Sequence, residues 1–434
     1  MRSCNRNNGN NVTYVNSTGN CTNNNANNGN FAAPDSADIR AIGIYEVGVV
    51  RDSGTGSLSP VAGWADGPRE QRGGDAIALV GGMAASAPER IDIEDVIGYD
   101  ALWESMERCR RGVMWKASVQ SFVLNAPAEI GRLCDQLHDG SYEPREPRRF
   151  TITSPKRREI VGIAFRDRVV QRSYNDNAIY PCMSRSWIYD NYACQTGKGT
   201  DFARGRMRCH LERHFRRHGC NGVVLAVDVR GYYDSMRLEV MDGRFRAKCP
   251  AWAAGFAHDT IARQYGRGHG VNPGSQLVQI AGVDYLDAID HAMKERMGVH
   301  SYGRYMDDMV MVLPDDRSAE ACLREVKRML AMVHMEAHDG KTRIIPVSEP
   351  FGFLGFDFAL MPSGHVRMTV RPDSVRRMRR RVSRLARLER EGLRPNGTTA
   401  QAYAGWRAHA AKGDSTRLLR RCDRWFNELG GNHV

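Results

Sequence analysis

The sequence lacks the features of a secreted or membrane-anchored protein. No apolar run approaches the roughly 20 residues that span a bilayer, and the opening stretch, MRSCNRNNGNN, contains no apolar segment like that of a signal peptide. The 11 cysteines are odd in number and include no Cys-x-x-Cys pair, which argues against a disulfide framework and against a structural zinc site. We therefore expect a cytoplasmic protein that does not bind membranes.

Acidic residues are in deficit. Lys and Arg number 62 against 50 Asp and Glu, so the formal net charge is +12 and the isoelectric point is about 9.3. This balance favours a polyanionic partner, nucleic acid first, although a basic surface that only keeps the protein soluble fits the charge equally well. A chain of 434 residues is too long for one core and suits two or three lobes.

The first 90 residues show no pattern that could build a core. Residues 1–30 contain 13 Asn and have neither a helical nor a strand period. Residues 51–90 are rich in Gly, Ala, Ser and Pro and are typical of a linker. We therefore interpret residues 1–90 as an Asn-rich low-complexity N-terminus with an irregular linker, and expect the folded part to begin near Ile91.

The remainder predicts a mixed α+β fold. Helical spacing of Ile97, Leu102 and Met106 indicates a helix, and alternation between residues 148 and 165 indicates a strand hairpin. The apolar run Val223–Val229 is typical of a buried central strand. The other expected elements are a helical stretch over 276–297, a strand–turn–strand unit over 302–313, an amphipathic helix over 318–336, strands within 351–358 and a helix beginning near Pro372.

Three acids stand where these strands end. Asp228 closes the buried strand, and Asp307 and Asp308 form the turn of the 302–313 unit. If both elements belong to one sheet, three carboxylates converge and repel one another unless cations lie between them. Two Mg²⁺ ions about 4 Å apart would resolve this and would clamp an in-line phosphoryl transfer. The simpler alternative is that two Asp residues form a polar turn.

The surrounding residues resemble a known family. Tyr305-Met306-Asp307-Asp308 matches the Tyr-x-Asp-Asp signature of reverse transcriptases, and "AVDVRGYYDS" resembles their first palm motif, with Asp228 as metal ligand. The similarity extends in order from about Ile91 to the C-terminus. It implies a right-hand polymerase in which residues 91–218 form fingers, 219–350 a palm, and 351–434 a primer-grip-like hairpin and a basic helical thumb.

The resemblance also implies roles for individual residues. An RNA-directed DNA polymerase would use two Mg²⁺ ions, or Mn²⁺ in their place, with an RNA template, a DNA or RNA primer and deoxynucleoside triphosphates as partners, and a basic accessory protein as a further partner. The implied catalytic residues are Asp228, Asp307, Asp308 and Lys341, and the metal ligands are Asp228, Val229, Asp307 and, as the weaker ligand, Asp308. The implied nucleotide-binding residues are Lys156, Arg158, Tyr233, Pro273, Gly274 and Gln279, and those for template and primer are Lys198, Phe353, Leu354, Gly355, Arg377, Arg380 and Arg384.

The basic tail supports a nucleic-acid partner. Residues 371–390 hold nine Arg against two acids. Val375, Met378, Val382 and Leu385 would line the apolar face of one helix, with the Arg side chains on the other. We interpret this face as a surface that follows phosphates, the alternative being a merely solvated face.

Two features indicate a subclass. In "GVNPGSQLVQ", Pro273 precedes Gly274 where most reverse transcriptases have Gln, and Gln279 ends the motif as in the enzymes of diversity-generating retroelements, although Pro273 and Val278 depart from those enzymes. The Asn-rich start resembles a translated template repeat, the alternative being an ordinary disordered tail. We therefore expect error-prone copying of a template repeat. The rival hypotheses are a reverse transcriptase of a phage-defence system and a non-catalytic RNA-binding protein on a polymerase scaffold.

Overall fold

The computed structural model describes residues 91–153, 158–266, 268–272 and 274–430. They all belong to Gly43–Val434, one of two units into which the chain divides. The interpretation of residues 1–90 falls outside the described part, as do the roles of Lys156 and Pro273, and of Arg158 only the backbone is described.

The described chain begins with short helices followed by a strand pair. The apolar positions Ile97, Leu102 and Met106 are buried, as their spacing predicts. Strands β1 and β2 pair antiparallel from Arg148↔Gly162 to Ile152↔Arg158, which confirms the predicted hairpin. The elements are α2 (Glu94–Ile97), α3 (Tyr99–Arg110), α4 (Ala117–Leu124), α5 (Ala126–His138), β1 (Arg148–Ile152) and β2 (Arg158–Gly162).

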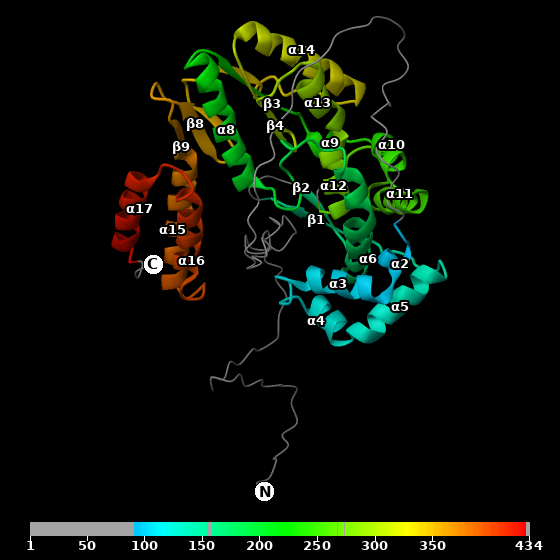
Figure 1. Cartoon of the computed structure of the whole chain (residues 1–434). Coiled ribbons are helices and arrows are strands. Elements are labelled where there is room, and N and C mark those ends of the chain that lie inside the picture. The colour runs from blue at the N-terminus through cyan, green and yellow to red at the C-terminus, as the bar shows by residue number, and fades with distance from the viewer. Residues whose placement is uncertain (1–90, 154–157, 267, 273, 431–434) are drawn as a thin grey trace, which may run out of the picture. The chain divides into compact units, whose positions relative to one another are not determined.

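Helices make up most of the middle of the chain (Figure 1). Two π-helical turns, η1 and η2, interrupt them. The elements are α6 (Phe165–Tyr174), η1 (Asn175–Ile179), α7 (Tyr180–Ser184), α8 (Thr200–His218), α9 (Tyr232–Ser235), α10 (Leu238–Lys248), α11 (Ala251–Tyr265), α12 (Gln276–Tyr285), α13 (Asp287–His291), η2 (Ala292–Arg296) and α14 (Asp316–Met332).

A four-stranded antiparallel sheet carries the acids. Its order is β4-β5-β3-β6, formed by β3 (Val223–Asp228), β4 (Tyr302–Tyr305), β5 (Asp308–Leu313) and β6 (Arg343–Pro346). The predicted buried strand is confirmed, although it ends at Asp228 and not at Val229. The predicted strand–turn–strand unit is β4 and β5, so both elements do belong to one sheet.

Both faces of this sheet are covered, which explains its continuous apolar sequence. On one face, Leu225 of β3 belongs to a core cluster that includes Leu330 of α14. On the other face, Val224 packs in a second cluster with Met207 and Leu211 of α8. Figure 1 shows α8 and α14 beside the strands that they cover.

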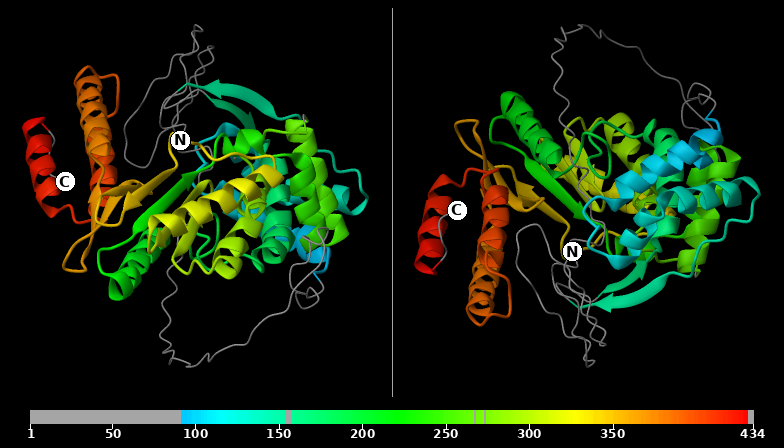
Figure 2. Two further views of the ribbon diagram at one scale, coloured as in Figure 1. Left: turned by 90° about the horizontal axis from the view of Figure 1, so that it is seen from above. Right: turned by 90° about the horizontal axis from the view of Figure 1, so that it is seen from below.

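A second, three-stranded sheet shares the cluster that contains Val224. It has the order β7-β8-β9, with β7 (Phe351–Phe353), β8 (Phe356–Leu360) and β9 (Val366–Val370), and it contacts α8 (Figure 2). The predicted strands within 351–358 are β7 and the start of β8.

Three helices end the described chain: α15 (Pro372–Arg390), α16 (Thr398–Ala410) and α17 (Thr416–Glu428). They share a small core that includes Met378 and Val382, the middle of the apolar face predicted for α15. Mixed α+β structure is thus confirmed. Within the described residues, none of the helices combines the length and the apolar character that crossing a bilayer demands.

Candidate active site

Strand register brings the three acids together. Asp228, the last residue of β3, pairs directly with Asp308, the first residue of β5. Tyr305 pairs with Asp308 across the β4–β5 hairpin, which leaves Met306 and Asp307 as a two-residue turn. Carboxylate oxygens of Asp228, Asp307 and Asp308 all lie within 4.8 Å of one another. The predicted convergence of the three acids is therefore confirmed.

The electrostatics of this group favour a cation. Burial, reinforced by the neighbouring Asp307 and Asp228, raises the pKa of Asp308 to about 7. Burial also raises the pKa of Asp307, with the charge of Asp228 as a second cause. Three carboxylates with one ammonium beside them keep an excess of negative charge, and a divalent ion bound by hard oxygen ligands would balance it.

Lys341 is the ammonium beside the group. Its Nζ lies 2.9 and 3.0 Å from the two carboxylate oxygens of Asp228, and this hydrogen bond raises the pKa of Lys341. The turn that carries Lys341 is fixed to the end of β3 because the backbone N–H of His338 donates to the carbonyl of Asp228 at 2.7 Å. The structure thus places Lys341 beside Asp228, although 113 residues separate the two, and the catalytic role of Lys341 stays a prediction.

Val229 offers only its backbone oxygen. It forms an antiparallel bridge with Ala337, flanked by the hydrogen bond from His338 to Asp228. In a pair of this kind the N–H and C=O of the bridged residue point away from the partner strand. The carbonyl of Val229 therefore faces the side of β3 on which β5 and its acids lie, as a metal ligand would.

Tyr233 lies against the catalytic turn. Its hydroxyl donates to Sδ of Met306 at 3.7 Å, and burial raises its pKa well above the ordinary value. Gly282 of α12 makes room for the ring, since a Cβ there would lie 3.4 Å from Cε1 of Tyr233. The side chain thus stands between α12 and the turn that carries Asp307.

The segment before α12 is tied to strand β2. The side-chain amide of Asn272 donates to the carbonyl of Glu159, and its Oδ1 accepts from the N–H of Gly274 at 3.1 Å. A Cβ at Gly274 would lie 3.3 Å from the carbonyl oxygen of Val161. The segment that contains Gly274 therefore lies beside the strand that begins at Arg158, which brings two predicted nucleotide-binding segments together.

Comparison with known proteins agrees with this geometry. Residues 153–358 match the model of the family described as reverse transcriptase (RNA-dependent DNA polymerase). The chain carries a reverse transcriptase domain. The matched range includes the three acids, Tyr233 and Lys341 and ends within β8, before the three C-terminal helices. No curated protein matches the chain.

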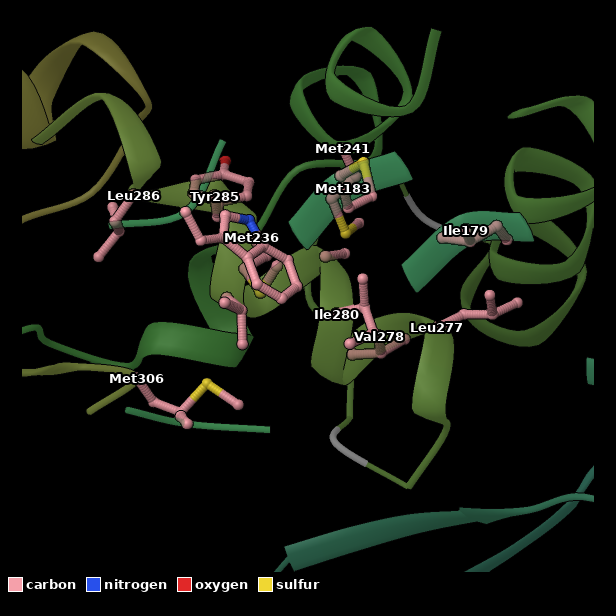
Figure 3. Packing of buried hydrophobic residues seen from close by; sticks show 14 of the residues in the cluster. Ile179, Met183, Met236, Met241, Leu277, Val278, Ile280, Tyr285, Leu286 and Met306 are labelled. Atoms are coloured by element: carbon pink, nitrogen blue, oxygen red, sulfur yellow. The ribbon is translucent and has the colours of Figure 1, made fainter. Parts of the chain in front are cut away.

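Within the reverse transcriptase domain, the two residues that end the motif after Gly274, Val278 and Gln279, differ in burial. Val278 is fully buried and packs with Leu277 and Ile280 of α12, as Figure 3 shows. Gln279, by contrast, is only half-buried, and its Oε1 lies 3.9 Å from Sγ of Cys194. Core packing therefore accounts for Val278, which leaves Gln279 as the residue of this pair suited to contact a nucleotide.

Lys198 already has internal partners. Its Nζ donates to the carbonyls of Tyr189 and Asn191, each at 2.9 Å, and lies 5.9 Å from the ring centre of Phe202. Burial lowers the pKa of Lys198. The structure gives this ammonium a role in holding the 188–191 segment, and its contact with a template stays a prediction.

The β7–β8 hairpin turn is held from two sides. Leu354 and Gly355 both adopt positive φ, 44° and 88°, as a two-residue hairpin turn demands. Arg204 of α8 donates to the carbonyl of Leu354 at 3.2 Å, and the ring of His409 lies against Gly355. Of the three predicted primer-grip residues, Phe353 is buried, whereas Leu354 is half-buried and Gly355 is exposed.

The predicted phosphate-binding Arg residues are exposed on α15. Arg377 is 72% exposed and pairs with Asp373 at 2.5 Å. Arg380 and Arg384 are also exposed and form no ion pair among the residues that the structure describes. These side chains are accessible to nucleic acid. Among the described residues, none of them forms a hydrogen bond or an ion pair with Asp228, Asp307 or Asp308.

Arg304 is a residue that the sequence reasoning missed. It is fully buried, and its guanidinium makes a bidentate pair with Asp290 (2.7 and 2.6 Å). The same guanidinium donates to the carbonyls of Val283 (2.7 Å) and Met306 (3.0 Å). The signal was available, because an Arg in a four-residue strand that is otherwise apolar or aromatic needs a buried partner.

Proposed function

We propose that the reverse transcriptase domain copies RNA into complementary DNA with two Mg²⁺ ions held by Asp228, Asp307, Asp308 and the carbonyl of Val229. The observation that carries this proposal is the group of three carboxylates within 4.8 Å, with one Lys beside it, inside a range that matches the family model. When bound, the ions would activate the primer 3′-hydroxyl and neutralise charge that develops on the phosphates.

The reaction transfers one nucleotidyl group. The primer 3′-oxygen bonds to the α-phosphorus of a deoxynucleoside triphosphate while the bond to the pyrophosphate oxygen breaks, and the proton of the hydroxyl is released. Asp228, Asp307 and Asp308 orient the reacting groups. Lys341, which pairs with Asp228 in the structure, lies close enough to the three acids that its ammonium would face the leaving pyrophosphate.

Tyr233 sets sugar selection in this proposal. Its ring is held between α12 and Met306, so it forms a fixed wall beside the catalytic turn. A deoxyribose fits against this wall, whereas a 2′-hydroxyl would collide with it. Gly274, Gln279 and the fingers residues Lys156 and Arg158 would hold the rest of the incoming nucleotide.

The division into subdomains is part of the proposal. Residues 91–218 would act as fingers, residues 219–350 as the palm, and residues 351–434 as the primer-grip hairpin and thumb. The fixed turn at Leu354 and Gly355 and the exposed Arg face of α15 support the last assignment.

We further infer that the enzyme belongs to a diversity-generating retroelement and copies a template repeat with errors at adenine. Gln279 supports that subclass, and core packing gives a structural reason for Val278, which departs from the motif of that subclass. Pro273 has neither a side-chain amide nor an N–H with which to hold a correctly paired nucleotide. A basic accessory protein would be a further partner of such an enzyme. A reverse transcriptase of a phage-defence system is the alternative.

Sequencing separates the two alternatives. Complementary DNA is made from one defined RNA by the wild-type enzyme and by Pro273→Gln, and errors are counted opposite each template base. The proposal predicts that errors concentrate opposite adenine and that Pro273→Gln lowers them; about 1.4 kcal/mol of regained discrimination is tenfold in error rate. An error rate at adenine no higher than at the other bases would leave only reverse transcription.

A further inference from the structure

A basic pocket lies at the end of the central sheet that is remote from the acids. It has a volume of about 410 Å³ and forms where the C-terminal half of α8 meets the 297–301 segment and the end of β5. Because β5 runs from Asp308 to Leu313, about 17 Å of extended strand separates the catalytic edge from the pocket. A triphosphate at the catalytic acids therefore cannot occupy it.

The lining of the pocket has charge of one sign. Five of its fifteen lining residues are Arg or His and none is Asp or Glu. The basic residues are Arg213, His214, Arg217, His218 and His300. The hydroxyls of two Ser residues add neutral donors. A concave surface that carries two guanidinium groups and no acid favours an anion.

The two Arg residues lack acidic partners. In the part of the chain that the structure describes, neither Arg213 nor Arg217 forms an ion pair, whereas Arg204 and Arg206 of the same helix do. Arg213 and Arg217 are four residues apart in α8, a spacing at which like charges destabilise a helix. A bound anion between them would remove this repulsion.

Basic residues near the end of a helix have a simpler explanation, since they complement the helix dipole. Arg217 and His218 do lie in the last turn of α8. Arg213 lies before that turn, however, and His300 comes from a different segment. The dipole therefore does not account for the whole group.

The floor of the pocket is closely packed. The ring of His214 is buried, and its Nε2 donates to the carbonyl of Asn221 at 2.6 Å. The next residue, Gly222, has φ 121°, and a Cβ there would lie 2.6 Å from both the ring of His214 and the carbonyl oxygen of Leu313. Only glycine allows this approach of α8 to β5, so the position of His214 is fixed by the backbone around it.

We propose that this pocket binds a phosphodiester of the RNA at a point outside the catalytic cleft. The two guanidinium groups provide the charge-assisted donors that a phosphate accepts, and the imidazoles of His218 and His300 can add neutral N–H donors. Arg217, His218 and His300 are exposed at the rim, so a continuous strand can enter and leave, and the net charge of +12 favours a polyanion over a small anion. This site is independent of which retroelement class the enzyme belongs to.

The test compares two RNAs that share one primed end. One is only long enough to fill the catalytic cleft, and the other extends well beyond it. For the long RNA, Arg213→Gln/Arg217→Gln should weaken binding and reduce the steepness of log K against log salt by about 1.4, which is two contacts at about 0.7 each. The short RNA should bind and be extended as in the wild type.

Two further proteins keep the test decisive. Arg208→Gln/Arg216→Gln removes two charges from the same helix outside the pocket lining, and it should leave the steepness for the long RNA near the wild-type value. His300→Glu changes an exposed side chain at the rim and should weaken the long RNA without any change in α8. Equal thermal unfolding midpoints would show that all three variants are folded.

The contradicting outcomes are specific. If the pocket variant and its control lower the steepness equally, the effect is one of net charge and the site is wrong. If inorganic phosphate broadens in ³¹P NMR with the wild type but not with the pocket variant, while long-RNA binding is unchanged, the pocket takes a free anion and the RNA assignment is overturned. Loss of the short RNA as well would place the pocket in the catalytic cleft and would also contradict the proposal.

Discussion

Nη1 of Arg304 lies 3.0 Å from the carbonyl oxygen of Met306, which precedes Asp307 in the catalytic turn. Met306 has φ 55°, a value that a non-glycine residue adopts only when its surroundings hold it there. The bidentate pair with Asp290 fixes the guanidinium in turn. Arg304 is thus a positioning residue for Asp307, although it does not contact the reacting groups.

Replacing Arg304 with Lys tests this role. The ammonium can still pair with Asp290 but cannot also reach the carbonyl of Met306 with the same fork of donors. We expect kcat to fall by about tenfold to a hundredfold, with the KM for the nucleotide nearly unchanged. Tyr302→Phe is the control, since it removes another hydrogen bond to Asp290 (2.5 Å) without touching the turn. If both variants lose kcat equally, Arg304 only supports the core.

Tyr233→Val should admit ribonucleotides. The smaller side chain removes the wall beside Met306 and leaves space where a 2′-hydroxyl would sit. Incorporation of ribonucleotides and deoxyribonucleotides into one primer is the measurement, and the ratio of kcat/KM values should shift toward ribonucleotides. Tyr233→Phe keeps the wall, loses only the hydroxyl that contacts Met306, and should still discriminate. A folded Tyr233→Val enzyme that continues to reject ribonucleotides would show that the ring is core packing alone.

The Arg face of α15 should contact phosphates. Arg377→Ala, Arg380→Ala and Arg384→Ala together should reduce the steepness of log K against log salt by about 2 to 3, at 0.7–0.9 for each contact. A matched control replaces three exposed Arg residues of α17, namely Arg417, Arg420 and Arg424. An unchanged slope in the α15 variant, or an equal loss in the control, would mean that this face is merely solvated.

Asp190 should make the fold sensitive to acid. Burial acts to raise its pKa, but hydrogen bonds from His210, Arg206 and Lys294 prevail and hold the pKa of Asp190 well below its usual range. A depressed carboxyl stabilises the fold above its unfolded pKa, about 3.9, and this contribution is lost as the pH falls below that value. Burial lowers the pKa of His210. The unfolded chain therefore takes up a proton at His210 more readily than the folded protein, and the fold loses stability as the pH falls below about 6.5, the ordinary pKa of His.

Asp190→Asn measures this contribution. The change leaves Arg206 and Lys294 without their charged partner (2.7 and 2.8 Å in the wild type) and should lower the free energy of unfolding at pH 7 by about 3 kcal/mol. Chemical denaturation at several pH values should also show a shallower loss of stability below pH 4 than in the wild type. Asp339→Asn, at an exposed ion pair with Lys327, should change both quantities far less, because solvent screens exposed pairs. Equal acid sensitivity of Asp190→Asn and wild type would contradict the assignment.

The elements with a local signal could be predicted from the sequence. The strands that carry Asp228 and Asp308 are apolar runs that end in acids, and the hairpin turn fixes which acids meet. The apolar spacing of α15 was likewise visible, because Met378 and Val382 recur at helical intervals between charged residues.

What could not be predicted depends on tertiary contacts. Helix α8 buries Ala203, Met207 and Leu211 at regular spacing, but its many Arg and His residues masked that pattern. The short strand β6 exists because it pairs with β3, and four residues alone give no such signal. The pair of Arg304 with Asp290 joins two elements whose contact no local pattern reveals. The internal hydrogen bonds of Lys198 to the carbonyls of Tyr189 and Asn191 were likewise not visible in the sequence.

The most direct measurement is primer extension on an RNA template by Asp307→Asn, beside the wild type and Asp339→Asn. The amide keeps the volume of the carboxylate but removes the charge that a metal ion needs. The proposed function predicts that the Asp307→Asn enzyme does not extend the primer but binds RNA nearly as the wild type does. The Asp339→Asn enzyme should extend the primer normally. Extension by Asp307→Asn at more than a few per cent of the wild-type rate would contradict the assignment of Asp228, Asp307 and Asp308 as the polymerase centre.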